Sequence, residues 1–176
     1  AAYDGMVETG EGYIGQILHK LEEAGQNLDD WIIVFTSDHG EMLGEHGIWA
    51  KHKFYESSAR VPLFIRWPAQ YRPRRITSNV NLCDLYATLC QLCDIPIPAG
   101  LDSRSLSCLM AGKEEDWDDE SISQYLGEYL MIKKGHLKYQ YYGPDMARVL
   151  FDLASDPSET INVIDSPPYN EAVLRF

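Results

Sequence analysis

An acidic residue stands directly beside an imidazole in Asp38–His39, which follow the apolar run 31–36. Carboxylates and imidazoles are both ligands that divalent metals accept. Adjacent side chains of a regular strand point to opposite faces, so the two reach one ion only where the strand breaks, and Gly40 permits such a break. The pair is therefore a candidate half-site for a metal. The alternative is that Asp38 caps a turn and His39 has a local partner.

A lysine follows this pair, with Lys51 thirteen residues after Asp38. A lysine near a metal can hold one oxygen of a tetrahedral anion and neutralise charge on a leaving group. We therefore interpret Lys51 as a candidate catalytic and substrate-binding residue, against the alternative of a solvated lysine. His46 and His52 are further candidates for substrate contact or proton transfer, and the alternative for each is a structural loop histidine.

The segment from Thr36 to Lys51 resembles the second metal-binding segment of the sulfatases, which belong to the alkaline-phosphatase superfamily. The similarity continues through residues 54–63, and this segment is very similar to the branch that contains choline sulfatase and phosphonate monoester hydrolases. Other parts of the chain also resemble the family, namely residues 3–8, 84–89, 100–106 and 150–153, with Asp156, Pro157 and Glu159. The resemblance therefore covers nearly the whole chain, as the carboxy-terminal portion of a sulfatase.

Carried over residue by residue, the resemblance implies roles for three side chains. Asp38 and His39 match the metal ligands, and Lys51 matches the lysine that contacts both the sulfate and the leaving-group oxygen. Many relatives have Asn where this chain has His39, so a divalent metal is implied while its identity stays open. Ca2+ is the expected ion, and Mn2+ or Mg2+ are alternatives. His46 and His52 match no role of the family.

The family's nucleophile is a formylglycine made from the cysteine of a Cys-x-Pro/Ala-x-Arg motif. None of the four cysteines begins such a motif. We expect the formylglycine and the family's paired aspartates upstream of Ala1, so that the chain carries half an active site and is inactive alone. By resemblance, the intact enzyme is a sulfuric ester hydrolase acting on a small-molecule sulfate ester. The alternatives are phosphonate or phosphate ester hydrolysis on the same scaffold, and an inactive truncated domain.

The elements that must position these residues have an α/β pattern. Apolar residues at helical spacing predict an amphipathic helix over 2–24, and another over 81–93. The apolar runs 31–36 and 61–67 predict strands of the kind that a parallel sheet buries on both faces. One helical turn is predicted over 54–58. Asp38–His39 then follows the carboxyl end of a strand, the edge where open α/β sheets bind ligands.

The chain changes character at about residue 121, where short Tyr-rich segments separated by glycines begin. They predict a small antiparallel sheet with strands over 123–129, 129–133, 136–142 and 149–153, and a final helix is predicted near Pro168. We expect residues 1–100 to be the carboxy-terminal part of an alkaline-phosphatase-like parallel-sheet sandwich. An acidic linker over 101–120 and a small antiparallel α+β subdomain over 121–176 are expected to follow.

Composition and charge exclude several classes of protein. The formal net charge of −12, from 15 basic and 27 acidic residues, repels phosphate backbones, so no nucleic-acid partner is expected. Basic residues nevertheless gather between 51 and 75, which favours an anionic ligand. The acids of 114–120 are expected to form a solvated loop. No apolar run reaches the ~18 residues that a membrane span needs.

Four cysteines are present, and none of them stands at zinc-finger spacing. Three of them, Cys83, Cys90 and Cys93, share the apolar stretch 82–93, which predicts buried reduced thiols on a core helix. Unpaired thiols and the lack of a visible signal peptide favour the cytoplasm, although the location stays open. Because missing strands would expose apolar surface, we also expect self-association.

Overall fold

The computed structural model describes residues 2–176, which form two compact units. The first unit comprises the chain up to Thr36 and the segment Pro62–Pro73. The second comprises Ser37–Val61 and Arg74–Phe176. Asp38, His39 and Lys51 therefore all belong to the second unit. Among the helices of residues 2–176, none combines the length and apolar character that a bilayer crossing requires.

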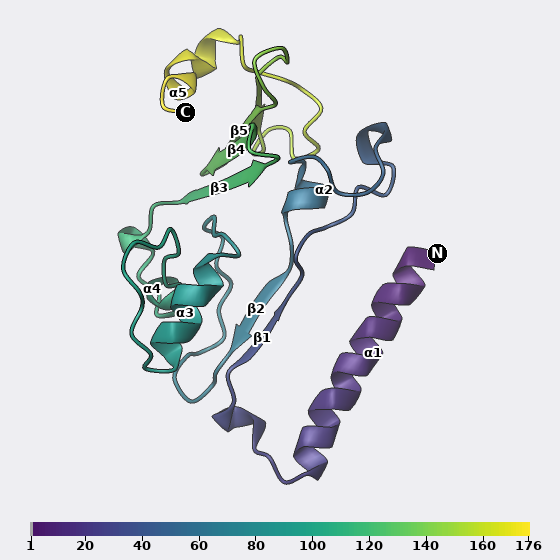
Figure 1. The fold of residues 1–176 in the computed structure, drawn as a ribbon, viewed down its shortest axis with the longest axis vertical. Coiled ribbons are helices and arrows are strands. Elements are labelled where there is room, and N and C mark those ends of the chain that lie inside the picture. The colour runs from purple at the N-terminus through teal and green to yellow at the C-terminus, as the bar shows by residue number, and fades with distance from the viewer. Residues whose placement is uncertain (1) are drawn as a thin grey trace. The chain divides into compact units, whose positions relative to one another are not determined.

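The first unit begins with the long helix α1, Ala2–Glu23, drawn in purple in Figure 1. Its ends complement the helix dipole, because Asp4 lies in the first turn and Lys20 in the last. Gly25 then adopts a left-handed conformation with φ of 79° and donates its N–H to the Glu22 carbonyl at 2.9 Å. A glycine in this conformation ends many helices. The helix predicted over 2–24 is confirmed.

Strands β1, Ile33–Thr36, and β2, Leu63–Arg66, form an antiparallel ribbon (Figure 1). Both strands were predicted, but their expected burial on both faces is wrong. Phe35 is 39% exposed and Phe64 is 64% exposed. Within residues 2–176 the two strands pair only with each other, and a two-stranded ribbon has no neighbouring layer that buries both faces.

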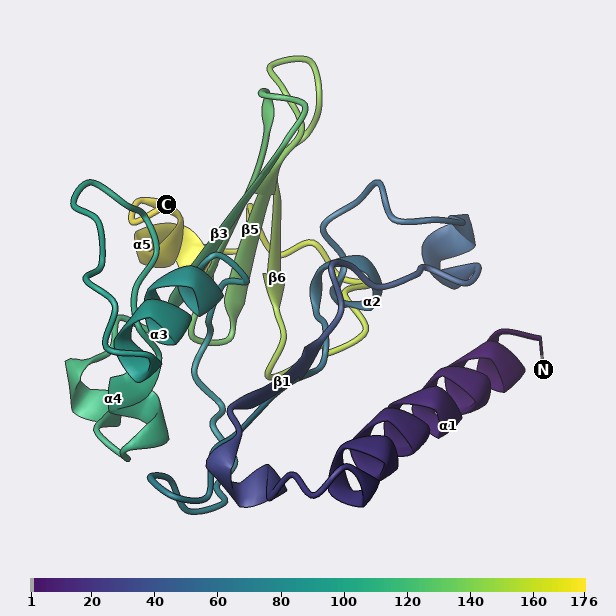
Figure 2. The same ribbon diagram turned by 60° about the horizontal axis from the view of Figure 1, so that its bottom comes forward.

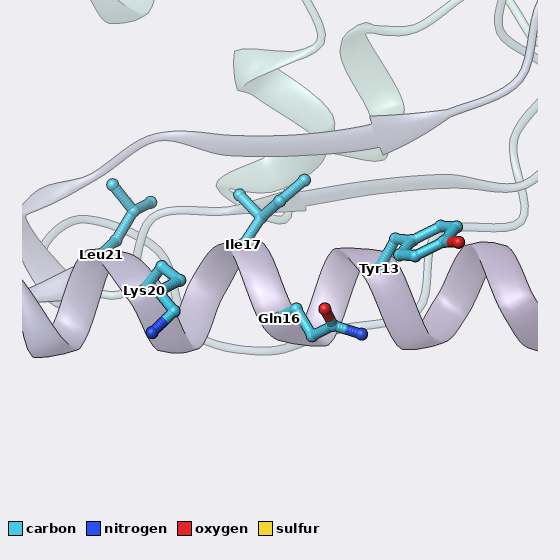
Figure 3. Close-up of a pocket in the computed structure, with 5 residues that line it drawn as sticks. All are labelled: Tyr13, Gln16, Ile17, Lys20 and Leu21. Atoms are coloured by element: carbon cyan, nitrogen blue, oxygen red, sulfur yellow. The ribbon is translucent and has the colours of Figure 1, made fainter.

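The apolar stripe of α1 is also open to solvent, since no residue of Ala2–Glu23 is buried. A shallow hollow of about 560 Å3 lies on this helix, and Figure 3 draws the residues that line it. In this view Ile17 and Leu21 project from one side of the helix, and Gln16 and Lys20 project from the other. Tyr13 completes its lining. Apart from Gln16, Lys20 and the Tyr13 hydroxyl, the side chains that line the hollow are apolar.

In the second unit, helices α3, Asp84–Leu92, and α4, Ser107–Met110, pack against each other. Two buried polar side chains of α3 fasten the chain that leads to α4. Asp84 Oδ1 accepts the N–H of Arg104 at 2.9 Å, and Thr88 Oγ1 accepts the N–H of Leu106 at 2.9 Å. Buried polar groups are stable when they are hydrogen-bonded in this way.

The four thiols are free, but they are not all buried as predicted. Cys90 is buried, Cys108 is half-buried, and Cys83 and Cys93 are exposed. Cys83 and Cys93 occupy the two caps of α3, whereas Cys90 lies on the helix face that packs inward. The prediction is therefore correct for Cys90 and wrong for Cys83 and Cys93, because an amphipathic helix buries one face and not its ends.

The carboxy-terminal part forms a four-stranded antiparallel sheet in the order β3-β4-β5-β6, whose strands lie side by side in Figure 2. The strands are β3, Glu120–Tyr125; β4, Tyr129–Lys134; β5, Leu137–Tyr141; and β6, Val149–Asp152. The predicted antiparallel sheet is confirmed. The short helices η4, Pro167–Tyr169, and α5, Asn170–Val173, confirm the helix predicted near Pro168.

The acidic segment before this sheet is only partly a solvated loop. The short helix η3, Glu114–Asp116, is exposed, and Glu114 pairs with Arg74 at 2.7 Å. Asp119 is held in place instead, because its Oδ1 accepts the backbone N–H of Asn79 at 2.6 Å and its side-chain amide at 2.9 Å. The domain boundaries expected at residues 100 and 120 stay a prediction.

Four charged side chains meet on the sheet and form what we call the buried charge cluster: Glu56, Lys133, Lys138 and Glu159. Lys138 is fully buried, and its Nζ lies 2.9 Å from Glu56 Oε1 and 2.9 Å from Glu159 Oε1. The first contact is a hydrogen bond, and the second is an ion pair without hydrogen-bond geometry. Lys133 Nζ lies 3.0 Å from Glu56 Oε2.

Burial alone raises the pKa of Glu56, but Lys138 and Lys133 outweigh burial and hold the pKa below its ordinary value. A carboxyl whose pKa is lower in the folded state stabilises that state at every pH at which the group is ionised. The cluster therefore links the short helix α2, Glu56–Ala59, to strands β4 and β5 by charge.

We predict that Lys138→Met lowers the free energy of unfolding by ~3–5 kcal/mol, because it leaves a buried carboxylate without its partner. Lys134→Met is the matched control, since the pair of Lys134 with Glu120 is longer, 3.4 Å, and its two side chains are 58% and 33% exposed. A pair of that kind contributes ~0–1 kcal/mol. Urea unfolding of both variants at neutral pH measures the difference, and equal losses would contradict the cluster's role.

We also predict a specific pH dependence for this cluster. Because the folded-state pKa of Glu56 is below its ordinary 4.5, its stabilisation is complete above that pH and is lost as pH falls through the depressed pKa. The difference in unfolding free energy between the native chain and Glu56→Gln should therefore be largest near neutrality and shrink below pH 4.5. Carboxyls outside the cluster cancel in this difference. A difference that stays constant from neutral to acidic pH would show that Glu56 is not held ionised.

Candidate metal centre and anion-binding lysine

Beyond β1 the chain leaves extended structure through a local turn at Asp38–His39. The Ser37 hydroxyl donates to the His39 carbonyl at 2.8 Å. The His39 N–H donates to Asp38 Oδ1 at 3.0 Å. Asp38 therefore caps the turn, as one alternative proposed, and the turn also releases the two side chains from the alternation of a regular strand.

Gly40 fixes this turn against α2. Its N–H donates to the Ser58 carbonyl at 2.8 Å. A Cβ placed on Gly40 would lie 2.0 Å from the Ser57 carbonyl oxygen, far inside van der Waals contact. Only glycine lets the two backbones approach so closely, so Gly40 is required for lack of space rather than for the strand break that the sequence suggested.

The His39 ring has a partner at each nitrogen. Nδ1 lies 2.8 Å from the Gly40 carbonyl oxygen, and Nε2 contacts Lys51 Nζ. An ammonium group can only donate, so Nε2 accepts and the proton of the neutral ring is assigned to Nδ1, which donates to Gly40. Histidines that bind metals usually donate their other ring N–H to a carbonyl or carboxylate in this way. The lone pair at Nε2 therefore accepts from Lys51 Nζ in this structure, and a metal ion bound there would take the place of that ammonium group.

Asp38 presents its second oxygen to the same place. Oδ2 lies 3.4 Å from His39 Nε2. Two ligands bound at about 2.0–2.4 Å from one ion, at angles between a right angle and a tetrahedral angle, are about 3–4 Å apart. The Asp38 side chain is 84% exposed and that of His39 is 36% exposed, so an ion can reach both. This donor pair fits a divalent metal.

Two donors do not complete a coordination sphere. Within residues 2–176, no group of three or more His, Cys, Asp or Glu side chains is placed to hold a metal. The assignment of Asp38 and His39 as half of a metal site therefore stays a prediction.

Lys51 reaches His39 because the loop between them closes on itself. The Met42 N–H donates to the Ala50 carbonyl at 2.9 Å, and the Ala50 N–H donates to Glu41 Oε1 at 2.6 Å. Ala50 is left-handed, with φ of 67°, which turns the chain at the residue before Lys51. The Ser58 hydroxyl then donates to the Lys51 carbonyl at 2.9 Å. The structure thus brings Asp38, His39 and Lys51 together.

The residues that shape this arrangement, Glu41, Ser57 and Ser58, were not identified from sequence. Glu41 is the nearest to a recognisable candidate, because it follows the Asp-His-Gly turn directly. Ser57 and Ser58 act through backbone carbonyls and one hydroxyl, and no residue type or spacing marks such a contact in advance.

His46 and His52 have aromatic partners of their own. The His46 ring stacks on Tyr55, with centroids 3.9 Å apart and planes inclined by 10°. His52 Nδ1 lies 3.0 Å from the Tyr125 hydroxyl at the end of β3. These contacts favour the structural alternative for both histidines, and a role in substrate binding stays a prediction.

Comparison with known proteins identifies similar chains along nearly the whole length. Residues 1–95 match the family model described as Sulfatase. The chain is 33% identical to arylsulfatase K of Xenopus laevis over 96% of its own length and 34% of that protein. It is 34% identical to the choline-sulfatase of Rhizobium meliloti (strain 1021), over 98% of this chain and 35% of the relative.

The fold is also similar to that of a solved enzyme. The phosphonate monoester hydrolase of Silicibacter pomeroyi superposes with a TM-score of 0.79 at 28% identity, over 93% of this chain and 36% of that one. The α/β fold class and the resemblance to this branch of the alkaline-phosphatase superfamily are thereby confirmed. The chain spans about a third of the length of the proteins that it matches.

We predict that Gly40→Ala destabilises the chain by ~1–3 kcal/mol or more, because the new methyl group overlaps the Ser57 carbonyl and forces backbone movement. Gly12→Ala is the control, since a Cβ there meets nothing within 4 Å and alanine favours a helix. Thermal unfolding compares the two variants. A Gly40→Ala variant as stable as the native chain would contradict the close approach.

Proposed function

This chain belongs to the sulfatase family, and we propose that it forms part of the active site of a metal-dependent hydrolase of sulfate monoesters. The observation that carries the proposal is the convergence of Asp38 Oδ2, His39 Nε2 and Lys51 Nζ. A carboxylate, a neutral imidazole and an ammonium group together suit a metal-bound tetrahedral oxyanion.

Asp38 and His39 would hold a divalent ion. When bound, such an ion polarises the oxygens of the ester group. The resemblance implies Ca2+, whose ligands are oxygens, while an imidazole also suits Mn2+, and Mg2+ is a further alternative. The Gly40 carbonyl lies where it can accept the Nδ1–H, which leaves Nε2 as the nitrogen that would bind the ion once Lys51 Nζ moves from it to the anion.

Lys51 would bind the anion and neutralise the charge that grows on the leaving oxygen as the ester bond breaks. Its ammonium is placed beside His39, on an exposed stretch of chain that an ester can approach. The formylglycine nucleophile of the family would come from outside residues 1–176, because no Cys-x-Pro/Ala-x-Arg motif occurs among them.

Hydrolysis of a phosphonate or phosphate ester is the second candidate function. The likeness to a phosphonate monoester hydrolase favours it, and sulfate and phosphate groups share a tetrahedral shape. The test is hydrolysis of an aryl sulfate and an aryl phosphodiester by the intact enzyme. Faster turnover of the sulfate supports the first function, and faster turnover of the phosphodiester overturns it in favour of the second.

Self-association through exposed apolar surface also remains a proposal. The side chains that support it lie on α1 and on the ribbon of β1 and β2, with Met6 and Ile17 each more than half exposed, as is Phe64. Where exposed apolar side chains adjoin one another, they mark a surface that another segment or molecule covers.

We predict that Asp38→Ala abolishes hydrolysis by the intact enzyme and weakens its binding of divalent metal.

Lys51→Met should lower kcat/KM by about 100- to 1,000-fold while metal affinity is retained, because the lysine acts on the developing charge. Exposed side chains of the same type, Asp145→Ala and Lys113→Met, are the matched controls.

Initial rates of hydrolysis and metal titrations of the four variants test these two predictions. Unchanged kinetics in Asp38→Ala would refute the metal assignment. A Lys51→Met variant that loses metal rather than catalytic rate would assign the lysine to the structure of the site instead of to the reaction.

A further inference from the structure

Helix α2 lies between the candidate site and the buried charge cluster. Its first residue, Glu56, belongs to the cluster, and its next two residues carry the contacts that shape the site. The Ser57 carbonyl limits the approach of Gly40, and the Ser58 carbonyl accepts the Gly40 N–H. The Ser58 hydroxyl holds the Lys51 carbonyl. The position of α2 therefore sets the backbone on both sides of the site.

One distant side chain fixes the beginning of α2. Glu159 Oε2 accepts the backbone N–H of Glu56 at 2.6 Å, across 103 residues of sequence. Its other oxygen lies 2.9 Å from Lys138 Nζ. Glu159 is buried, so each of its oxygens is occupied by an interaction that water cannot replace without opening the structure.

Glu159 is itself held rigidly by the turn that carries it. Its backbone is left-handed, with φ of 54°, which costs a residue other than glycine ~1–2 kcal/mol. Asp156 stabilises the turn, because its Oδ2 accepts the N–H groups of Thr160 and Ile161, each at 2.7 Å. A strained conformation persists only where its surroundings determine it. The carboxylate is thus presented to α2 from a fixed position.

We propose that Glu159 is a positioning residue of the candidate site. It acts through α2, by fixing the Ser57–Ser58 backbone against which the Asp38–His39 turn and Lys51 are placed, and it touches neither metal nor ester. The effect of Glu159 on metal binding rests on the proposed function. The effect of Glu159 on the Gly40 hydrogen bond requires neither metal nor substrate.

The first measurement is amide hydrogen exchange in the 176-residue chain, with the Gly40 N–H as the probe. Glu159→Ala should accelerate its exchange by more than the loss of global stability accounts for. Leu109→Ala is the matched control, because Leu109 is fully buried on α4, which packs against α3, and its loss destabilises by leaving a cavity. Glu159→Gln keeps an oxygen that can accept the Glu56 N–H and should restore most of the protection.

The second measurement is Mn2+ affinity of the intact enzyme. Loss of a residue that orients metal ligands typically raises the dissociation constant about 10- to 100-fold, and we expect this for Glu159→Ala and no change for Leu109→Ala. Ser58→Ala is a milder variant that removes only the hydroxyl contact with Lys51. If Glu159→Ala does not fold, Ser58→Ala should still lower kcat while leaving the unfolding midpoint nearly unchanged.

The outcomes separate this inference from the function on which it rests. If Glu159→Ala behaves as Leu109→Ala does in both measurements, the positioning role is overturned, and if Ser58→Ala keeps full kcat, the placement of Lys51 through the Ser58 hydroxyl is overturned. Asp38→Ala reports on the function independently. Unchanged metal binding in Asp38→Ala would overturn the metal centre, and the exchange of the Gly40 amide would still decide whether Glu159 positions the turn.

Discussion

The burial of Lys138 is the constraint on which the second unit depends. An ammonium group without water is stable only when carboxylates take the place of its hydration, because removing a charge from water costs several kcal/mol. Here Glu56 and Glu159 supply them, and Lys133 balances the remaining charge. The four groups come from a short helix, two strands and a carboxy-terminal turn, so an arrangement that separated these elements would leave a buried charge without its partner.

The same charge cluster connects the sheet, through α2, to the candidate site residues. The helix that carries Glu56 continues into Ser57 and Ser58, whose carbonyls meet Gly40. Glycine is required there because no side chain fits between the two backbones. The turn that Gly40 completes lets Asp38 and His39 face the same side, and the closed loop that follows returns Lys51 to His39. Helix α2 thus connects the Asp38–His39 turn and Lys51 to the buried charge cluster.

Local patterns predicted much of this structure. The helix of residues 2–23 and the strands of the carboxy-terminal sheet follow from apolar spacing and from glycines at turns, which act over a few residues. Asp38, His39 and Lys51 were singled out as candidates chiefly because residues 36–51 resemble the metal-binding segment of the sulfatases, and their roles stay a prediction. Their convergence, however, depends on α2 and on the closed loop, and neither was evident from residue types.

Long-range contacts account for what the sequence did not predict. Glu56 meets Lys138 and Glu159 across 82 and 103 residues, and each would be expected at the surface as a single charged residue. The prediction that Cys83 and Cys93 are buried was wrong. Both residues cap a helix, and exposure at a helix end depends on packing rather than on apolar periodicity. The predicted burial of the strand at 31–36 failed because apolar runs specify a need for neighbouring layers without supplying them.

Pulsed electron paramagnetic resonance of the Mn2+-loaded intact enzyme tests the central claim most directly, because it detects a nitrogen bound to the metal. We expect the coupling of a directly coordinated imidazole nitrogen in the native enzyme. In His39→Asn, whose side chain offers an oxygen in its place, the metal should remain bound and the coupling should disappear. The same nitrogen coupling in both proteins, or none in the native enzyme, would contradict the assignment of His39 as a ligand.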